Sequence, residues 1–230
     1  MASKVENPAD LRTMYAARTP PVVKALASQL VWSGPPGPAE SPTVYLTFDD
    51  GPHPSITREA MAVLGNVPAL FFCVGANVER HAEVVGELQA AGHAVGNHAH
   101  RHESGWETRG VAYLRSYLAC ERALRSASGS GSVAFRPPYG RITRSQAAAI
   151  GRRSEIVMWD VLSGDFDVRE SADSCLARLQ RATRPGSVVV FHDSEKAASR
   201  MLGALPRYVA WLAEQGYTAK PLPIRPLQPH

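Results

Sequence analysis

The sequence predicts an α/β protein in which parallel strands alternate with helices. Short apolar runs with the composition of strands recur along the chain, and amphipathic stretches with a helical period lie between them. Gly92 and Gly216 each stand between a helical pattern and the next strand, where a helix commonly ends on glycine. The 230 residues, 44% of them hydrophobic, suffice to bury the core of one such domain.

Seven segments have the composition of strands. The stretches between them are too long for hairpins, which favours crossover connections and a parallel sheet. The sheet is either a closed barrel or an open, doubly wound sheet. No glycine-rich phosphate loop follows the first strand, which argues against the nucleotide-binding form of the open sheet. The expected strands are residues 44–48, 69–74, 93–96, 133–136, 156–161, 188–192 and 217–220.

The helical patterns are amphipathic. Apolar residues share one face over residues 78–88, 114–124 and 202–212, and a short helix is expected near residues 22–30. Pro206 falls inside the last of these patterns, so that helix is expected to begin near the proline or to kink there.

Composition excludes several classes of protein. The net charge is +4, but the basic residues are scattered along the chain, so no nucleic-acid partner is expected. No apolar run approaches the roughly 20 residues of a membrane span. The first residues lack an apolar leader, so a soluble protein is expected, cytoplasmic as given or secreted if a leader was removed. Three cysteines without CxxC spacing argue against a disulfide framework or a zinc ribbon.

Chemically active side chains follow the expected strands. The carboxyl ends of parallel strands meet at one edge, which is where barrel enzymes carry their active sites. The sequence therefore predicts that these side chains converge. They are Asp49, Asp50, His98, His100, His102, Arg136, Tyr139, Asp165, His192 and Asp193.

The aspartates and histidines have the composition of a metal site. Adjacent strand residues point to opposite faces, so Asp49 and Asp50 serve one site only if the backbone turns, as Gly51-Pro52 predicts. His98 and His102 share a face in a strand or in a helix. Two imidazoles and one carboxylate leave a coordination position open for hydrolysis. The alternatives are aspartates that cap a turn and a histidine-rich surface loop.

Two further segments carry catalytic residue types. In Arg136-Pro-Pro-Tyr139 the prolines have no N–H, so the first backbone donor is that of Tyr139, which suits a developing oxyanion. His192 follows a fully apolar run and suits a general acid. Each segment also has a purely structural alternative when it is considered alone. The first could be a rigid loop with an arginine ion pair, and His192 could be a core histidine whose hydrogen bonds are satisfied.

Five motifs together resemble the polysaccharide deacetylases, carbohydrate esterase family four. They are TFDDGP at 47–52, HAHRH at 98–102, RPPYG at 136–140, SGDF at 163–166 and VVFHD at 189–193. The resemblance implies a distorted (β/α)7 barrel, similar to a TIM barrel, over a catalytic domain at 43–222. Residues 1–42 are then an N-terminal lead-in and residues 223–230 a tail. It also implies metal-dependent removal of acetyl groups from N-acetylated sugars, chitin-like or of the peptidoglycan type, with release of acetate.

The resemblance implies a role for each motif residue. Asp50, His98 and His102 would hold a divalent metal, with zinc the expected ion and His100 an additional candidate ligand. Asp49 would be the general base, and Arg136 would orient it. The Tyr139 N–H would stabilise the oxyanion, while His192, oriented by Asp165, would protonate the leaving amine.

The motifs also depart from the family pattern. Leu162 stands where the family has an aspartate, and Phe166 where it has tryptophan. Val189 replaces a leucine and is expected to widen the pocket for the acetyl methyl group. Aromatic side chains that suit sugar stacking are Trp106, Tyr139, Trp159 and Phe166. Two alternatives remain: an amidohydrolase of the same barrel that acts on a non-sugar C–N bond, and a non-catalytic sugar-binding protein. The sequence predicts no oligomeric state.

Overall fold

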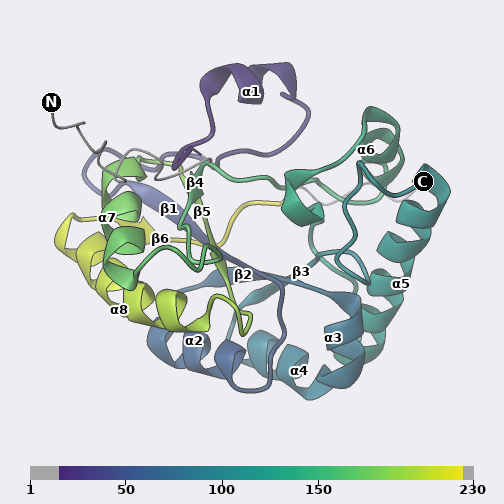
Figure 1. The fold of residues 1–230 in the computed structure, drawn as a ribbon. Coiled ribbons are helices and arrows are strands. Elements are labelled where there is room, and N and C mark those ends of the chain that lie inside the picture. Colours follow the sequence, from purple (N-terminus) through teal and green to yellow (C-terminus); the bar gives the residue numbers. More distant parts are fainter. Residues whose placement is uncertain (1–15, 225–230) are drawn as a thin grey trace, which may run out of the picture.

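Parallel strands form the centre of the molecule, and helices cover their outer side (Figure 1). The computed structural model describes residues 16–224. The neighbouring strands pair in the order β3-β2-β1-β5-β4, and β6 pairs separately with the beginning of β1. All of these pairings are parallel, as the long connections predict. The strands are β1 (Thr43–Asp49), β2 (Ala69–Cys73), β3 (Ala94–Asn97), β4 (Val161–Leu162), β5 (Val188–His192) and β6 (Thr218–Ala219).

The barrel closes between β3 and β4 through single bridges rather than through full strands. Phe135 forms isolated parallel bridges to Asn97 and to Ile156. The sequence predicts strands over 133–136 and 156–161, but only the short β4 is a strand there. Pro137 and Pro138 follow at once and have no N–H to extend a ladder. The resulting fold is the expected distorted barrel.

Eight α-helices and one 3-10 helix accompany the strands of the described part. The pattern over 78–88 divides into two helices because His81, with φ −138°, interrupts it. The last helix begins well before Pro206 and continues through it. The helices are α1 (Pro21–Leu26), α2 (Ile56–Leu64), α3 (Gly75–Arg80), α4 (Ala82–Ala90), α5 (Gly110–Ser128), η2 (Pro138–Gly140), α6 (Arg144–Ile150), α7 (Ala172–Ala182) and α8 (Ala198–Glu214).

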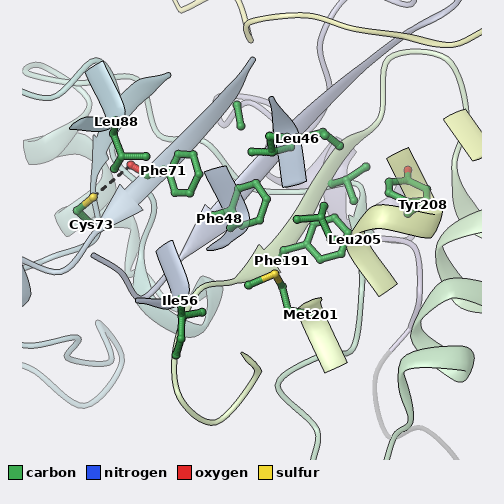
Figure 2. Packing of buried hydrophobic residues seen from close by; sticks show 14 of the residues in the cluster. Leu46, Phe48, Ile56, Phe71, Cys73, Leu88, Phe191, Met201, Leu205 and Tyr208 are labelled. Carbon is green, nitrogen blue, oxygen red and sulfur yellow. Dashed lines mark hydrogen bonds between the residues drawn. The ribbon is translucent and has the colours of Figure 1, made fainter. Parts of the chain in front are cut away.

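The main hydrophobic core lies between the sheet and the outer helices (Figure 2). Phe48 is its centre: its ring stacks on Phe71 at 4.6 Å and on Phe191 at 5.6 Å between centroids. Burying a side chain of this size stabilises the fold by about 1.5–3 kcal/mol. Because strand residues alternate between faces, Phe48 in this core places its neighbours Thr47 and Asp49 on the barrel interior.

Part of the predicted lead-in pairs with the barrel. Val31 forms a parallel bridge with Val157, and Arg18 forms an antiparallel bridge with Val161. Residues 1–15 of the lead-in and 225–230 of the predicted tail lie outside the described residues. Within residues 16–224, none of the helices has the length and apolar character needed to span a bilayer.

Candidate metal and catalytic site

A turn at the end of β1 brings both aspartates into one site. Asp49 is the last residue of β1 and faces the barrel interior, and Asp50 adopts the left-handed backbone conformation, with φ 82°. This turn cancels the strand alternation that would otherwise separate the two carboxylates. The side chain of Asn77 donates to the Asp50 carbonyl at 2.7 Å, and the Gly51 N–H donates to the Asp193 carboxylate at 3.1 Å. Both contacts hold the turn in place.

The histidines lie on a loop that is neither strand nor helix. Ala99 and His102 have positive φ values of 59° and 57°, and the loop between them returns His102 to the side of His98. The expectation of a strand or helical face is therefore wrong in its geometry, although the two imidazoles do meet, with their centroids 5.0 Å apart. His100 turns away, and its Nε2 lies 3.8 Å from Glu79.

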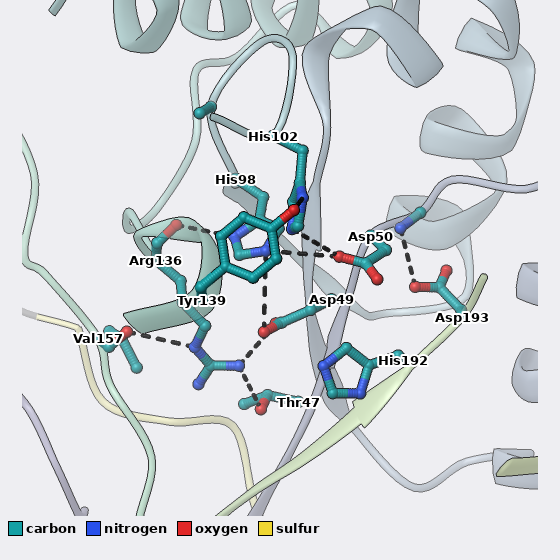
Figure 3. Close-up of polar contacts among 12 residues, drawn as sticks. Thr47, Asp49, Asp50, His98, His102, Arg136, Tyr139, Val157, His192 and Asp193 are labelled. Carbon is teal, nitrogen blue, oxygen red and sulfur yellow. Dashed lines mark hydrogen bonds and ion pairs between the residues drawn. The ribbon is translucent and has the colours of Figure 1, made fainter. Parts of the chain in front are cut away.

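Three side chains form a cluster that fits a divalent metal (Figure 3). One ligand atom from each of Asp50, His98 and His102 lies within 4.8 Å of the others. Oδ1 of Asp50 is buried and accepts no hydrogen bond from any described residue. It nevertheless lies 3.0 Å from Nε2 of His102 and 3.6 Å from Nε2 of His98. Such a convergence of acceptor atoms suits a cation bound between them.

The outer contacts of the histidines agree with this interpretation. Nδ1 of His98 donates to the Arg136 carbonyl at 2.8 Å, so its Nε2 presents a lone pair toward Asp50. Burial lowers the pKa of His98 to about 4, which keeps the ring neutral near pH 7. Burial alone would raise the pKa of Asp50, but the imidazoles of His102, His192 and His98 hold it well below its ordinary value.

Arg136 is fully buried and anchors Asp49 from inside the barrel. Its Nη1 donates to Asp49 Oδ1 at 2.7 Å and to the Thr47 hydroxyl at 2.8 Å (Figure 3). The guanidinium also donates to the carbonyls of Val157 and Met158, and its carbon lies 4.2 Å above the ring of Phe72. These contacts compensate the buried charge and fix one oxygen of Asp49, which leaves Oδ2 facing the site.

His192 and Asp165 form a second, equally close pair. Nδ1 of His192 lies 2.7 Å from Asp165 Oδ1, and the His192 N–H donates to Oδ2 at 2.9 Å. Burial alone would lower the pKa of His192, but the charge and hydrogen bond of Asp165 raise it to about 9. The imidazole is therefore held protonated at neutral pH, on the same side of the barrel as Asp49 and Asp50 (Figure 3).

Tyr139 and Phe166 flank the cluster. The Tyr139 hydroxyl lies 3.1 Å from Nδ1 of His102, and the edge of the ring of Phe166 contacts His192 at 5.2 Å between centroids. Tyr139 has a positive φ of 58°, and no described residue accepts a hydrogen bond from its N–H. A groove of about 620 Å³ opens beside Asp50 and extends to Lys196, and its lining includes Asp50 but neither of the two histidines of the cluster.

Val189 is not in the site, and the expectation that it widens an acetyl pocket is wrong. Its side chain packs in the main core with that of Phe191. Strand alternation puts Val190, not Val189, on the face of His192. Counting back by two from His192 along the sequence would have given this assignment.

Two residues support the site in ways that the sequence did not predict: Thr47, which belongs to the first motif, and Asp193, which was expected only to lie near the other active side chains. Thr47 accepts a hydrogen bond from the same Arg136 guanidinium as Asp49. Its position two residues before Asp49 in the strand indicates that both side chains lie on the same face. Asp193 accepts from the Gly51 N–H and, at 2.5 Å, from the Thr57 hydroxyl. Burial raises its pKa to about 7. Only the fold reveals that Asp193, directly after β5, supports the turn after β1.

Comparison with known proteins agrees with the geometry. The family model described as polysaccharide deacetylase matches residues 37–153. A chitooligosaccharide deacetylase of Sinorhizobium fredii is 33% identical over 203 residues, which are 80% of this chain and 91% of that protein. The chain belongs to the polysaccharide deacetylase family.

Two further relatives in this family are named for peptidoglycan. A peptidoglycan-N-acetylglucosamine deacetylase of Bacillus cereus is 32% identical over 161 residues, 69% of this chain and 58% of that protein. A crystal structure of a peptidoglycan N-acetylglucosamine deacetylase in complex with 4-naphthalen-1-yl-N-oxidanyl-benzamide has a TM-score of 0.80 at 28% identity. The match covers 89% of this chain and 96% of that one.

Proposed function

We propose that this protein is a metal-dependent hydrolase that removes acetyl groups from N-acetylated sugars of chitin-like or peptidoglycan-type glycans and releases acetate. The observation that carries the proposal is the division of labour between the two aspartates. Asp50 joins the two imidazoles, whereas Asp49 lies against Arg136 and is not part of that cluster. Metal-assisted amide hydrolysis uses this combination of a Lewis-acid site and a separate base.

We assign the cofactor site to Asp50, His98 and His102, and zinc is the ion we expect there. Two nitrogens and one carboxylate oxygen are ligand types that zinc binds, and a three-ligand set leaves a position open. A metal bound by these three residues supplies a Lewis acid that polarises the acetyl carbonyl and acidifies water. His100, which faces Glu79, is left out of the ligand set.

Asp49 is assigned as the general base. Arg136 occupies its Oδ1 and fixes the carboxylate, so Oδ2 is free to take a proton from the attacking water. A positioned base of this kind contributes on the order of 10²–10⁴ to the rate.

His192 is assigned as the general acid. Asp165 holds Nδ1, which leaves Nε2, at the other edge of the ring, to donate a proton. A pKa raised to about 9 gives the imidazole the proton that the departing nitrogen needs, because an amine anion is a poor leaving group. The Tyr139 N–H is assigned as an oxyanion donor, in keeping with its exposed position and left-handed backbone.

Acetate release tests the function directly. The protein is stripped with a chelator and incubated with N-acetylglucosamine oligomers and with peptidoglycan fragments, with and without zinc, manganese or cobalt. We expect release only when a divalent ion is added. Metal binding without release from any acetylated sugar would contradict the proposal and favour a non-sugar C–N bond as the target.

A further inference from the structure

We infer that Asn77 is a positioning residue for the metal site and acts within a short segment that connects the two halves of that site. The segment is residues 74–77, which run from the end of β2 into α3, and we call it the connecting segment. The inference rests on the metal assignment of the proposed function. It goes beyond that assignment, because none of these four residues is an assigned ligand or belongs to one of the five motifs.

Both halves of the metal site have a backbone conformation that L-amino acids rarely adopt. Asp50 has φ 82°, and the histidine loop, residues 98–102, has φ 59° at Ala99 and 57° at His102. A residue other than glycine is strained in this conformation, so the conformation persists only where surrounding contacts fix the backbone from several directions. The positions of the ligand atoms therefore depend on the contacts that hold these two segments.

The connecting segment holds the aspartate half through two hydrogen bonds. Nδ2 of Asn77 donates to the Asp50 carbonyl at 2.7 Å, and the Val74 N–H donates to the Gly51 carbonyl at 2.7 Å. Nη2 of Arg80, one turn further along α3, donates to Oδ1 of Asn77 at 2.5 Å. Because an arginine can donate only to the oxygen of the amide, this contact turns the Asn77 nitrogen toward Asp50.

The same segment holds the histidine half through backbone donors. The Gly75 N–H donates to the Ala99 carbonyl at 2.9 Å. The Ala76 N–H donates to the next carbonyl along the loop, that of His100, also at 2.9 Å. A Cβ at Gly75 would lie 2.5 Å from Nδ1 of His100 and 2.9 Å from Cα of Cys120 in α5, so a side chain there would displace the loop or the helix. Four consecutive residues thus contact both segments that carry the ligands.

Asn77 is the member of the segment through which this role can be tested. Of the four contacts, only that of Asn77 is made by a side chain, so a substitution removes it and leaves the backbone donors in place. Loss of a purely structural contact lowers the stability of the metal-free fold. Loss of a positioning contact also lowers the affinity of the folded protein for the metal, because the ligand atoms no longer converge before the ion binds.

The test measures the Kd for zinc of chelator-stripped protein, by competition with a chromophoric chelator, in the wild type, Asn77→Ala and Asn77→Leu. Leucine has nearly the shape of asparagine but no donor. We expect both variants to bind zinc about tenfold more weakly, because residues that orient metal ligands contribute on this scale. The matched control is Gln89→Ala, a half-buried amide of α4 that donates to Ser130 rather than to a segment that carries a ligand. It should bind zinc as the wild type does.

Cobalt provides a second readout, because the visible spectrum of bound Co²⁺ reports the geometry of its ligands. We expect altered bands in the Asn77 variants and unaltered bands in Gln89→Ala. Lower stability of the Asn77 variants in urea, with the Kd and the spectrum of the wild type, would overturn the inference. A wild type that binds neither ion would overturn it as well. Neither readout involves acetate release, so bound metal without hydrolysis of any acetylated sugar contradicts only the proposed function.

Discussion

At the scale of single residues, the backbone of Asp50 assembles the site. Its φ of 82° lets two successive residues face the same centre, although strand geometry alone would separate them. Asp49 then lies 2.7 Å from Arg136, while Asp50 lies 3.0 Å from His102. Nε2 of His98 lies near both, 3.6 Å from Asp50 and 4.0 Å from Asp49, but the shortest contact of each carboxylate is with a different residue. From this difference we derive their different roles.

Substitution of the two aspartates is expected to have separable effects. Asp49→Asn should bind the metal as the wild type does and lose activity by about 10²–10⁴-fold, because only the base is removed. Asp50→Ala should lose both metal and activity. Metal content after dialysis and acetate release are measured on both variants. Equal loss of metal in the two would contradict the assignment of ligand and base.

His93 is a buried titratable group outside the site. Its side chain contacts the Phe71 ring at 5.3 Å, and neither ring nitrogen has a hydrogen-bond partner among the described residues. Burial lowers its pKa, so below its ordinary pKa the unfolded chain binds this proton more readily than the folded one. The contribution of a neutral His93 to stability is therefore present at pH 7.5 and lost as the pH falls below about 6.5.

His93→Leu is accordingly expected to reduce the acid sensitivity of the fold. The difference in Tm between pH 7.5 and pH 5 should be smaller in the variant than in the wild type, as measured by circular dichroism. The other histidines are the same in both proteins, so their effects cancel in the comparison. The same pH dependence in both proteins would show that His93 does not titrate on unfolding.

At the scale of elements, the segment before β1 is part of the barrel wall. Asp160 is almost fully buried and accepts hydrogen bonds from Arg18 at 3.1 Å and from Ser187 at 2.7 Å. Lys24 of α1 also donates to this carboxylate. One carboxylate thus connects the lead-in, the segment before β4 and the start of β5.

Removing this carboxylate should loosen three segments at once. We expect Asp160→Ala to lower the free energy of unfolding by about 3 kcal/mol, because a buried, paired charge is lost. Arg18→Ala should cost less than about 1 kcal/mol, because that side chain is 49% exposed and the pair is screened by water. Urea titration measures both. A larger effect for Arg18 than for Asp160 would contradict this account.

At the scale of the whole molecule, the barrel brings the carboxyl ends of separate strands to one side. Asp49 ends β1, His98 follows β3 and His192 ends β5, so metal binding links parts of the chain far apart in sequence. A ligand that binds only the folded state stabilises it by mass action. At a hundred times its Kd the gain is about 2.7 kcal/mol.

Added zinc should therefore raise Tm. For a chain of this size the expected rise is roughly 5–10 °C. The Asp49→Asn variant should show the same rise, and the Asp50→Ala variant should show little. Differential scanning calorimetry of chelator-stripped protein, with and without metal, provides the measurement. No rise in the wild type under conditions of confirmed binding would show that the metal binds the unfolded chain equally well.

The fold class and most of the residues that meet in the site can be predicted from the sequence. Strand and helix periods depend on local geometry, and the motifs name their residues directly, so Asp49, Asp50, His98, His102, Arg136 and His192 were identified without a structure. The motifs do not show to which side of the sheet each side chain points. Val189 was assigned to the site, although strand alternation turns it into the core.

The contacts by which distant segments support one another are visible only in the folded molecule. Three features join residues that are separated along the chain. Asp193 supports the turn at Asp50, two expected strands are reduced to bridges, and Arg141 stacks on Trp106. Sequence periodicity records which face of an element is buried, and not which partner covers it. Partners depend on the packing of the whole barrel, and this is why they appear only in the folded molecule.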